Sequence, residues 1–252
     1  MKLQFLGTGT STGVPQLGCS CEVCTSSDPR DNRLRCSALL TVGSKNILID
    51  CTPDFRYQAL RAGIEYIDTV LLTHSHYDHT GGIDDLRPFT YARPLPMYAE
   101  KNVINDIRNR LPYCFMENPY PGIPRLDVRP ISPQHSFMVD DIEIVPLRVM
   151  HYNLPIVGFR IGRMAYITDC LTMPDETKAQ LRDLDVLVLN ALRRTTHISH
   201  QTLDDALALI EQLAPRRAYL THMSDRMGLH SDIQSIVPQS VEFAYDGLCV
   251  EI

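Results

Sequence analysis

The stretch LLTHSHYDHTGG at residues 71–82 holds three histidines and an aspartate directly after an apolar run. Imidazole and carboxylate groups together are the ligands of borderline divalent ions such as Zn²⁺ and Mn²⁺. Two histidines at positions i and i+2 of an extended chain face the same side, so His74 and His76 can point at one ion. The stretch therefore predicts a metal site at the end of a buried strand.

Three later segments, PLRVMHYN, AYITDC and AYLTHMS, also place a histidine or an aspartate just after an apolar run. Taken alone, each of these residues would more often be structural than a ligand. Seven ligands are too many for one tetrahedral ion and suit two ions that share a bridge. The candidate ligands are His74, His76, Asp78, His79, His151, Asp169 and His222.

A second metal site is indicated by GCSCEVC at residues 18–24. Cys19, Cys21 and Cys24 lie within six residues, a spacing typical of structural zinc sites in a reducing compartment. The other five cysteines have no such spacing, and we interpret them as small buried residues or incidental thiols. They are Cys36, Cys51, Cys114, Cys170 and Cys249.

The rest of the chain must supply the elements that position these groups. Residues 111–133 contain six prolines and predict a long ordered loop or lid. Strands in runs, followed by strands that alternate with helices, indicate two packed sheets flanked by helices. Strands are expected at 3–7, 37–42, 45–50, 68–72, 141–149, 185–190 and 217–221. Hairpins are expected at 157–168, turning at Gly162-Arg163, and at the closing segment 241–252, turning at Asp246-Gly247. Helices are expected at 54–62, 100–110 and 203–213.

Length and composition favour a single domain over residues 1–252, because the chain is 44% hydrophobic and long enough for an ample core. The formal net charge of −6 argues against a nucleic-acid partner bound through a broad basic face. No apolar run reaches the roughly 18–20 residues of a membrane span, and the first residues lack a signal-peptide core. We therefore expect a cytoplasmic protein with no membrane partner.

The HSHYDH motif, followed by Gly81 and Gly82, resembles the signature of the metallo-β-lactamase superfamily, and the resemblance covers nearly the whole chain. It implies an α/β fold, the four-layer αββα sandwich, with a two-metal site at one edge. The resemblance also implies a ligand assignment and a hydroxide shared by the two ions. In that assignment the first ion is held by His74, His76 and His151, the second by Asp78, His79 and His222, and Asp169 bridges both.

Two further segments indicate which branch of the superfamily this chain resembles. FLGTGTSTGVP at residues 5–15 resembles the opening of the branch that includes transfer-RNA 3′-processing nucleases and PhnP-like cyclic phosphodiesterases. Its free N–H groups could cradle phosphate oxygens. In THISHQTLDDAL the resemblance implies that His200 touches the scissile phosphate and protonates the leaving oxygen, a role that suits a near-neutral pKa. Helix capping or surface exposure is the alternative for His200, and His197 stays open between the two.

The cysteine loop resembles the structural zinc site of the PhnP-like branch, whose fourth ligand is a histidine three residues after the last catalytic histidine. Here Asp225 stands at that position, and a carboxylate oxygen can also bind zinc. We therefore expect Asp225 as the fourth ligand, with His230 as the alternative.

The sequence thus favours a metal-dependent phosphodiesterase, with two Zn or Mn ions in the active site and one structural Zn. The resemblance implies a small cyclic or nucleotide-like phosphodiester as substrate, with 5-phosphoribosyl 1,2-cyclic phosphate as a candidate. Asp78 favours a phosphodiester over a β-lactam substrate, because β-lactamases often lack that aspartate. A transfer-RNA 3′ endonuclease, a thioester or lactone hydrolase and a non-catalytic metal-binding protein remain as alternatives. The loop at 111–133 could reshape the pocket or mediate a homodimer.

Overall fold

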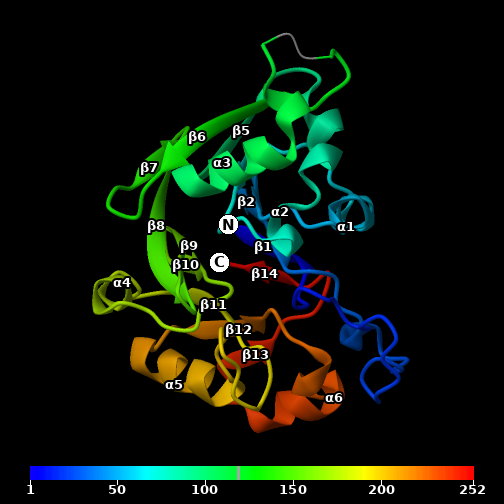
Figure 1. Cartoon of the computed structure of the whole chain (residues 1–252). Coiled ribbons are helices and arrows are strands. Elements are labelled where there is room, and N and C mark those ends of the chain that lie inside the picture. The colour runs from blue at the N-terminus through cyan, green and yellow to red at the C-terminus, as the bar shows by residue number, and fades with distance from the viewer. Residues whose placement is uncertain (118–119) are drawn as a thin grey trace.

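The computed structural model describes residues 1–117 and 120–252 of the chain, in which the strands form two sheets. Figure 1 shows one sheet above the other. The first has the order β14-β1-β2-β3-β4-β5-β6, with bounds β1 Lys2–Gly7, β2 Ser37–Val42, β3 Lys45–Ile49, β4 Thr69–Leu71, β5 Leu95–Glu100, β6 Leu126–Ile131 and β14 Cys249–Glu251. The second has the order β13-β12-β11-β10-β9-β8-β7, with bounds β7 Phe137–Val139, β8 Ile142–His151, β9 Leu154–Ile161, β10 Met164–Tyr166, β11 Val186–Asn190, β12 Arg217–Thr221 and β13 Val241–Phe243.

Helices cover the outer face of each sheet, so the predicted four-layer αββα sandwich is confirmed (Figure 1). The α-helices of the described residues are α1 Phe55–Ala62, α2 Tyr77–Thr80, α3 Lys101–Arg110, α4 Asp175–Ala179, α5 Leu203–Leu213 and α6 His230–Ile233. Short 3₁₀ turns lie at Pro29–Asp31, Ile83–Thr90, Pro112–Phe115, Asp225–Met227 and Gln234–Ile236. No helix in the described residues combines the length and the apolar character that a membrane crossing needs.

The hydrophobic core has three parts, one between the sheets and one under each helical layer. Phe5, Phe159 and Tyr166 are fully buried between the sheets, and burial of each such side chain stabilises the fold by roughly 1.5–3 kcal/mol. The amphipathic helix α5 packs Ile210 against the second sheet. Its start is fixed by Thr202, which exchanges hydrogen bonds with the third residue of the helix in a capping box.

Parallel pairing brings the ligand-bearing ends of several strands to one edge. β3 pairs with β4 in parallel in the first sheet, and β10, β11 and β12 pair in parallel in the second. The carboxyl ends of parallel neighbours meet at the same edge of a sheet. The expected strand-end ligands therefore lie within reach of one another.

The predicted closing hairpin at Asp246-Gly247 is wrong. β13 pairs with β12 in the second sheet, whereas β14 pairs with β1 in the first. The turn instead crosses between the sheets, because the Asp246 carboxylate accepts hydrogen bonds from Thr8 Oγ1 (2.8 Å) and the Leu34 amide (2.8 Å). The strand pattern was visible in the sequence, but these contacts with distant residues were not.

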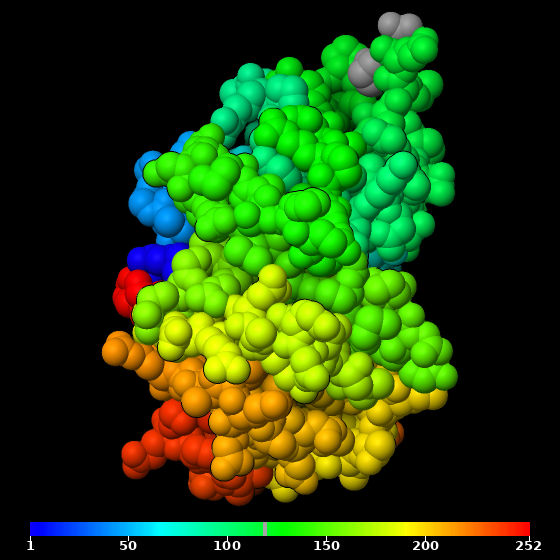
Figure 2. Space-filling model, turned by 90° about the vertical axis from the view of Figure 1, so that its left-hand side faces the viewer, coloured from blue at the N-terminus to red at the C-terminus, as the bar shows by residue number. Residues whose placement is uncertain are grey.

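The loop predicted over 111–133 is shorter than expected. Pro112–Phe115 form a 3₁₀ turn and Leu126–Ile131 form β6, an edge strand parallel to β5. Pro130 fits there because an edge strand leaves one side of its backbone unpaired. Residues 120–125 project from this end of the molecule (Figure 2). Residues 118–119 of the predicted loop lie outside the described residues.

A buried polar cluster links the N-terminal loop to α6. Arg33 donates to Thr8 Oγ1 (2.9 Å) and to the Ala244 carbonyl (2.6 Å), and its Nη2 lies 3.2 Å from His230 Nδ1. The His230 amide donates to an Asp31 carboxylate oxygen (2.7 Å). Burial and the neighbouring positive charge of Arg33 lower the pKa of His230 to about 4.

We expect this cluster to make folding pH-dependent between about pH 6.5 and 4. The unfolded chain protonates His230 near pH 6.5, but the folded chain does so only near pH 4. The unfolded state therefore binds more protons in this window, and stability falls as the pH is lowered, by about 1–3 kcal/mol from this group. His230→Gln, whose amide oxygen can still accept from Arg33, should flatten the profile in urea titrations. The exposed His135→Gln is the control, and parallel profiles for the wild type and His230→Gln would contradict the expectation.

Candidate metal centre

The seven predicted ligands converge at one edge of the sandwich, each from the carboxyl end of a strand. His74 and His76 follow β4, and Asp78 and His79 lie on the short helix α2. The other three come from the second sheet, at the end of β8 or just after β10 and β12: His151, Asp169 and His222. Segments more than 140 residues apart in the chain thus meet at a single point.

The carboxylates lie between the imidazoles. Asp169 places its Oδ2 3.2 Å from His79 Nε2 and its Oδ1 3.3 Å from His222 Nε2. Asp78 Oδ2 lies 3.2 Å from His79 Nε2 and 3.7 Å from His222 Nε2. The ring of His74 lies 4.2 Å from that of His79, centroid to centroid. Asp169 also has a donor atom within 4.8 Å of donor atoms of His74 and His151, so it occupies the position expected of a bridging carboxylate.

Three sets of donor atoms each lie within 4.8 Å of one another. They are His74 with His79 and Asp169, Asp78 with His79 and His222, and His151 with Asp169 and His200. His76 is more exposed, and its ring packs 4.6 Å from His74 and 5.2 Å from His151 by centroid distance, outside these tight sets. The geometry brings six of the seven predicted ligands into these sets, places His76 beside them and adds His200.

Buried imidazole nitrogens without hydrogen-bond partners show that these residues fit metal ions. Within the described residues, the Nε2 atoms of His74, His79 and His222 are buried and make no hydrogen bond. An unsatisfied buried polar group costs about 1–3 kcal/mol. Three such atoms around ionised carboxylates are the arrangement that a divalent cation would satisfy, and nitrogen and oxygen donors suit Zn²⁺ or Mn²⁺.

The opposite ring nitrogens are oriented by neighbours, as is usual for metal-binding histidines. His79 Nδ1 lies 2.7 Å from Asp50 Oδ2, His74 Nδ1 lies 2.9 Å from Thr73 Oγ1, and His151 Nδ1 lies 2.9 Å from the Ser199 carbonyl. A proton on each Nδ1 leaves the Nε2 lone pair directed to the centre. The three rings therefore share one tautomer and one direction of coordination.

Asp50 was not among the sequence candidates. It is fully buried and accepts from the Thr73 amide (2.8 Å) and hydroxyl (2.9 Å) as well as facing His79. The signal that identified Asp169, an acid directly after an apolar strand, is also present in KNILID at residues 45–50. The sequence therefore contained the information, but nothing in it connected Asp50 to His79.

The electrostatics of the centre favour a bound cation. Burial opposes the charged imidazole of His79, but Asp169, Asp78 and Asp50 raise its pKa well above the usual value. Burial likewise opposes ionisation of Asp169, but His222 and His79 hold its pKa well below the usual range. Asp169 thus stays ionised, and His79 retains an extra proton between the carboxylates. A metal ion would replace that proton.

Backbone strain is concentrated at this centre. Among the described residues, seven non-glycine residues have positive φ, and four of them lie here: Asp50, Tyr152, Asp169 and His222, with φ of 59°, 54°, 55° and 59°. Such conformations cost of order 1–3 kcal/mol each and persist where the surrounding structure holds them. The strain aims side chains from the strand ends into the centre.

The N-terminal glycine-rich loop packs against the chain that follows a predicted ligand. The amides of Gly9 and Thr10 donate to the carbonyls of Leu34 (2.8 Å) and Met223 (3.0 Å), and the Met223 amide donates to the Thr8 carbonyl (2.9 Å). These N–H groups are already satisfied, so the predicted phosphate cradle is not available to them. The loop instead holds the backbone immediately after His222.

Gly82 explains the double glycine after the histidine motif. Its amide donates to the Cys51 carbonyl (3.0 Å), and a Cβ atom there would lie 2.0 Å from the Thr52 carbonyl oxygen. The Cys51 amide in turn donates to the His79 carbonyl (2.8 Å). Only glycine permits this close approach, which fixes α2 against the end of β3.

His200 lies inside the centre, as the resemblance implied. Its ring lies 4.6 Å from that of His151, and its Nδ1 lies 3.8 Å from Asp169 Oδ1. Burial, followed by the nearby His222, lowers its pKa to about 3, so it differs from the near-neutral value expected. His200 is therefore neutral at pH 7 in this structure. His197 is partly exposed, and its Nδ1 accepts from the Ser199 amide (3.3 Å).

The cysteine loop brings its three thiols to Asp225. The donor atoms of Cys19, Cys21, Cys24 and Asp225 all lie within 4.8 Å of one another, and Asp225 Oδ2 lies 3.6 Å from Cys21 Sγ. His230, the alternative fourth ligand, instead faces Arg33. Three thiols and a carboxylate at this spacing fit one zinc ion.

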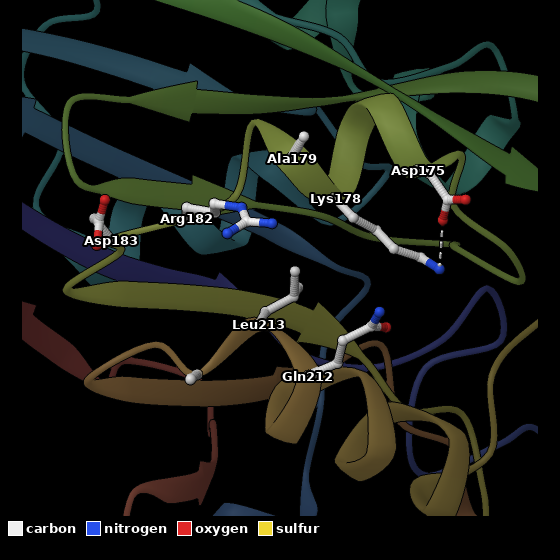
Figure 3. A pocket seen from close by; sticks show the side chains of 8 residues that line it. Asp175, Lys178, Ala179, Arg182, Asp183, Gln212 and Leu213 are labelled. Atoms are coloured by element: carbon white, nitrogen blue, oxygen red, sulfur yellow. Dashed lines mark ion pairs between the residues drawn. The ribbon is translucent and has the colours of Figure 1, made fainter.

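A separate hollow of about 530 Å³ lies between α4 and α5, at the surface (Figure 3). Lys178 and Arg182 line it, and Lys178 pairs with Asp175 at 3.1 Å. None of its lining residues belongs to the metal centre. We assign it no catalytic role.

The fold and this set of side chains define the class of metal-dependent hydrolases. Residues 45–223 match the family model of the beta-lactamase superfamily domain. A solved structure described as a new diphosphatase from the PhnP family is 37% identical, has a TM-score of 0.92, and is matched over 99% of this chain and 96% of its own. This chain therefore belongs to the β-lactamase superfamily and, within it, to the PhnP family.

Two other relatives extend the comparison. The octanoyltransferase of Porphyromonas gingivalis is 48% identical over 250 residues, which is 98% of this chain and 51% of the relative. The chain thus spans about half the length of this curated relative. The Zn²⁺-bound PqqB of Methylobacterium extorquens has a TM-score of 0.86 with full coverage of both chains, and at 19% identity it shows that the fold is shared.

Proposed function

We propose that this chain hydrolyses a small cyclic or nucleotide-like phosphodiester, with 5-phosphoribosyl 1,2-cyclic phosphate as a candidate substrate. One observation carries the proposal: Asp78 lies 3.2 Å from His79 and 3.7 Å from His222, so the centre includes a carboxylate for a second ion. The 37% identical relative described as a diphosphatase of the PhnP family supports a phosphorus-centred reaction.

The ligand division in this proposal follows the resemblance. His74, His76 and His151 would hold the first divalent ion, Asp78, His79 and His222 would hold the second, and Asp169 would contribute to both. Zn or Mn ions there would supply a water-derived nucleophile at neutral pH and positive charge for the phosphoryl oxygens.

The chain's own residues orient the reaction. Asp169 lies between the two halves of the centre, because its donor atom is within 4.8 Å of donor atoms of His74 and His151, and its carboxylate also faces His79 and His222. His200 is neutral, so it donates a hydrogen bond from an imidazole N–H to the phosphate or the leaving oxygen. Its burial keeps water from competing for that bond.

The test is hydrolysis by the metal-loaded protein of four substrates in parallel: bis(4-nitrophenyl) phosphate, the cyclic phosphoribosyl ester, ADP as a diphosphate, and octanoyl-CoA as a thioester. The proposal expects the phosphodiesters to have the highest kcat/KM. Asp78→Ala and His200→Ala should lose most of that activity while keeping the melting temperature of the wild type. Full activity in both variants, or none on either phosphodiester, would exclude it.

Thioester hydrolysis is the second candidate, because one relative matched over 98% of this chain is named an octanoyltransferase. The relative is about twice as long as this chain, and its name describes the whole protein. The octanoyl-CoA assay decides the question. A kcat/KM on the thioester above that on every phosphorus ester would favour this candidate.

We further propose that Cys19, Cys21, Cys24 and Asp225 bind one structural zinc ion. If free zinc stands a hundredfold above Kd, binding stabilises the fold by about 2.7 kcal/mol. Cys21→Ser should therefore lose one zinc per chain and lower the unfolding temperature by about 5–10 °C. Elemental analysis and calorimetry check both. The exposed Cys249→Ser is the matched control, and equal zinc content in the two variants would contradict the site.

A further inference from the structure

Large apolar side chains remain exposed around the metal centre. Tyr77, Tyr152 and Ile198 are 65%, 52% and 69% exposed, and each lies within two residues of a side chain of the centre. Single exposed apolar residues are ordinary on protein surfaces. Three that flank one site are a feature of the rim that a substrate must cross.

Tyr152 lines a hollow that opens onto the candidate ligands. The hollow has a volume of about 470 Å³ and is lined by His76, His151, Tyr152, Asn153, Leu154 and Ser199. Two of the lining residues, His76 and His151, are therefore candidate ligands of the first ion. The others combine an aromatic ring and the apolar side chain of Leu154 with a side-chain amide and a hydroxyl, a lining that suits a flat ring with a polar edge.

The backbone keeps Tyr152 in place at a conformational cost. Tyr152 and Asn153 form the two-residue turn between β8 and β9, since His151 pairs with Leu154. Tyr152 has φ of 54°, and a positive φ at the first position of such a turn favours glycine. A bulky residue in this conformation is a genuine outlier, and outliers of this kind cluster at ligand-binding sites.

We infer that Tyr152 determines specificity by stacking on the nucleobase of a nucleotide phosphodiester, whose edge Asn153 reads by hydrogen bonds. The inference rests on the proposed phosphodiesterase function and narrows it to nucleotides, so it sets aside the base-less 5-phosphoribosyl 1,2-cyclic phosphate as the preferred substrate. Aromatic side chains stack on any base, and the amide of Asn153 offers both a donor and an acceptor. The phosphate then lies on the side of His76 and His151.

The test compares two esters with one leaving group. Thymidine 5′-(4-nitrophenyl phosphate) carries a base, and methyl 4-nitrophenyl phosphate does not. Base stacking predicts that the ratio of their kcat/KM values is about 10- to 100-fold in the wild type. Tyr152→Asn, whose side chain tolerates positive φ, should reduce that ratio by the same factor, mainly through KM. Tyr152→Phe, which keeps the ring, should retain it.

The outcomes separate this inference from the proposed function. If the wild type hydrolyses both esters without preference, the inference fails and the phosphodiesterase function stands. If it hydrolyses neither, the proposed function fails. An equal loss on both esters in Tyr152→Asn shows that the ring supports the metal centre and not a base, which overturns the inference. A loss in Tyr152→Phe as large as in Tyr152→Asn overturns the stacking role.

Discussion

Asp169→Asn is expected to lower kcat on bis(4-nitrophenyl) phosphate by about 10³-fold or more and to reduce the metal bound at the His/Asp centre to at most one ion, in addition to the structural zinc. The carboxylate lies within 3.3 Å of His79 and His222 from the second half of the ligand set, and its donor atom is within 4.8 Å of those of His74 and His151 from the first. Losses of this size are typical when one member of a cooperating group is removed. The pKa of Asp169 lies well below its usual range, so the wild-type carboxylate is ionised at neutral pH.

Asparagine is the right replacement because it keeps the shape of the side chain and tolerates the φ of 55° at this position. Asp183→Asn is the matched control, since Asp183 has φ of 57° and is exposed away from the centre. Elemental analysis gives the metal content, and steady-state kinetics give kcat. An Asp169→Asn protein that binds as much metal as the Asp183→Asn control and turns over like it would show that Asp169 does not bridge.

Local pattern was sufficient for much of the fold. The hairpin of β2 and β3 turns at Gly43-Ser44, and α5 spans Leu203–Leu213, both as expected. Both were predictable because turn residues and the helical period of apolar side chains are properties of neighbouring residues in the sequence. β6 was missed since Pro130 and a polar face hide a strand that only its pairing with β5 reveals. The pairing of β14 with β1 likewise depends on contacts with residues far along the chain.

The candidate ligands were predictable for a different reason. Each follows an apolar strand, and strand ends are the positions where a sheet can direct side chains to one edge. The residues that support them were less visible. Asp50, and the carbonyl of Ser199 that orients His151, act through contacts that only the fold creates. The pKa of His200 depends on burial, which its local sequence does not encode.

Two substitutions of Asp50 can separate its role in orienting the ligand His79 from its role in stabilising the fold. In Asp50→Ala the Thr73 amide, the Thr73 hydroxyl and His79 Nδ1 lose their acceptor inside the protein. We expect the free energy of unfolding to fall by about 2–4 kcal/mol, measured by urea titration of the metal-free protein. Alanine also tolerates the φ of 59° less well than aspartate, which adds to the loss.

Asp50→Asn should keep most of that stability and still weaken metal binding about 10- to 100-fold. Its amide oxygen can accept from Thr73, but its amide N–H then faces His79 Nδ1, which must become an acceptor. The ring proton moves to Nε2, and Nε2 no longer offers its lone pair to the second ion, the same tautomer logic that governs a catalytic aspartate–histidine pair. Competition with a calibrated chelator measures the affinity, and Asp183→Asn again serves as the control. If Asp50→Asn binds both ions as tightly as the wild type, Asp50 supports the fold and does not set the direction of His79.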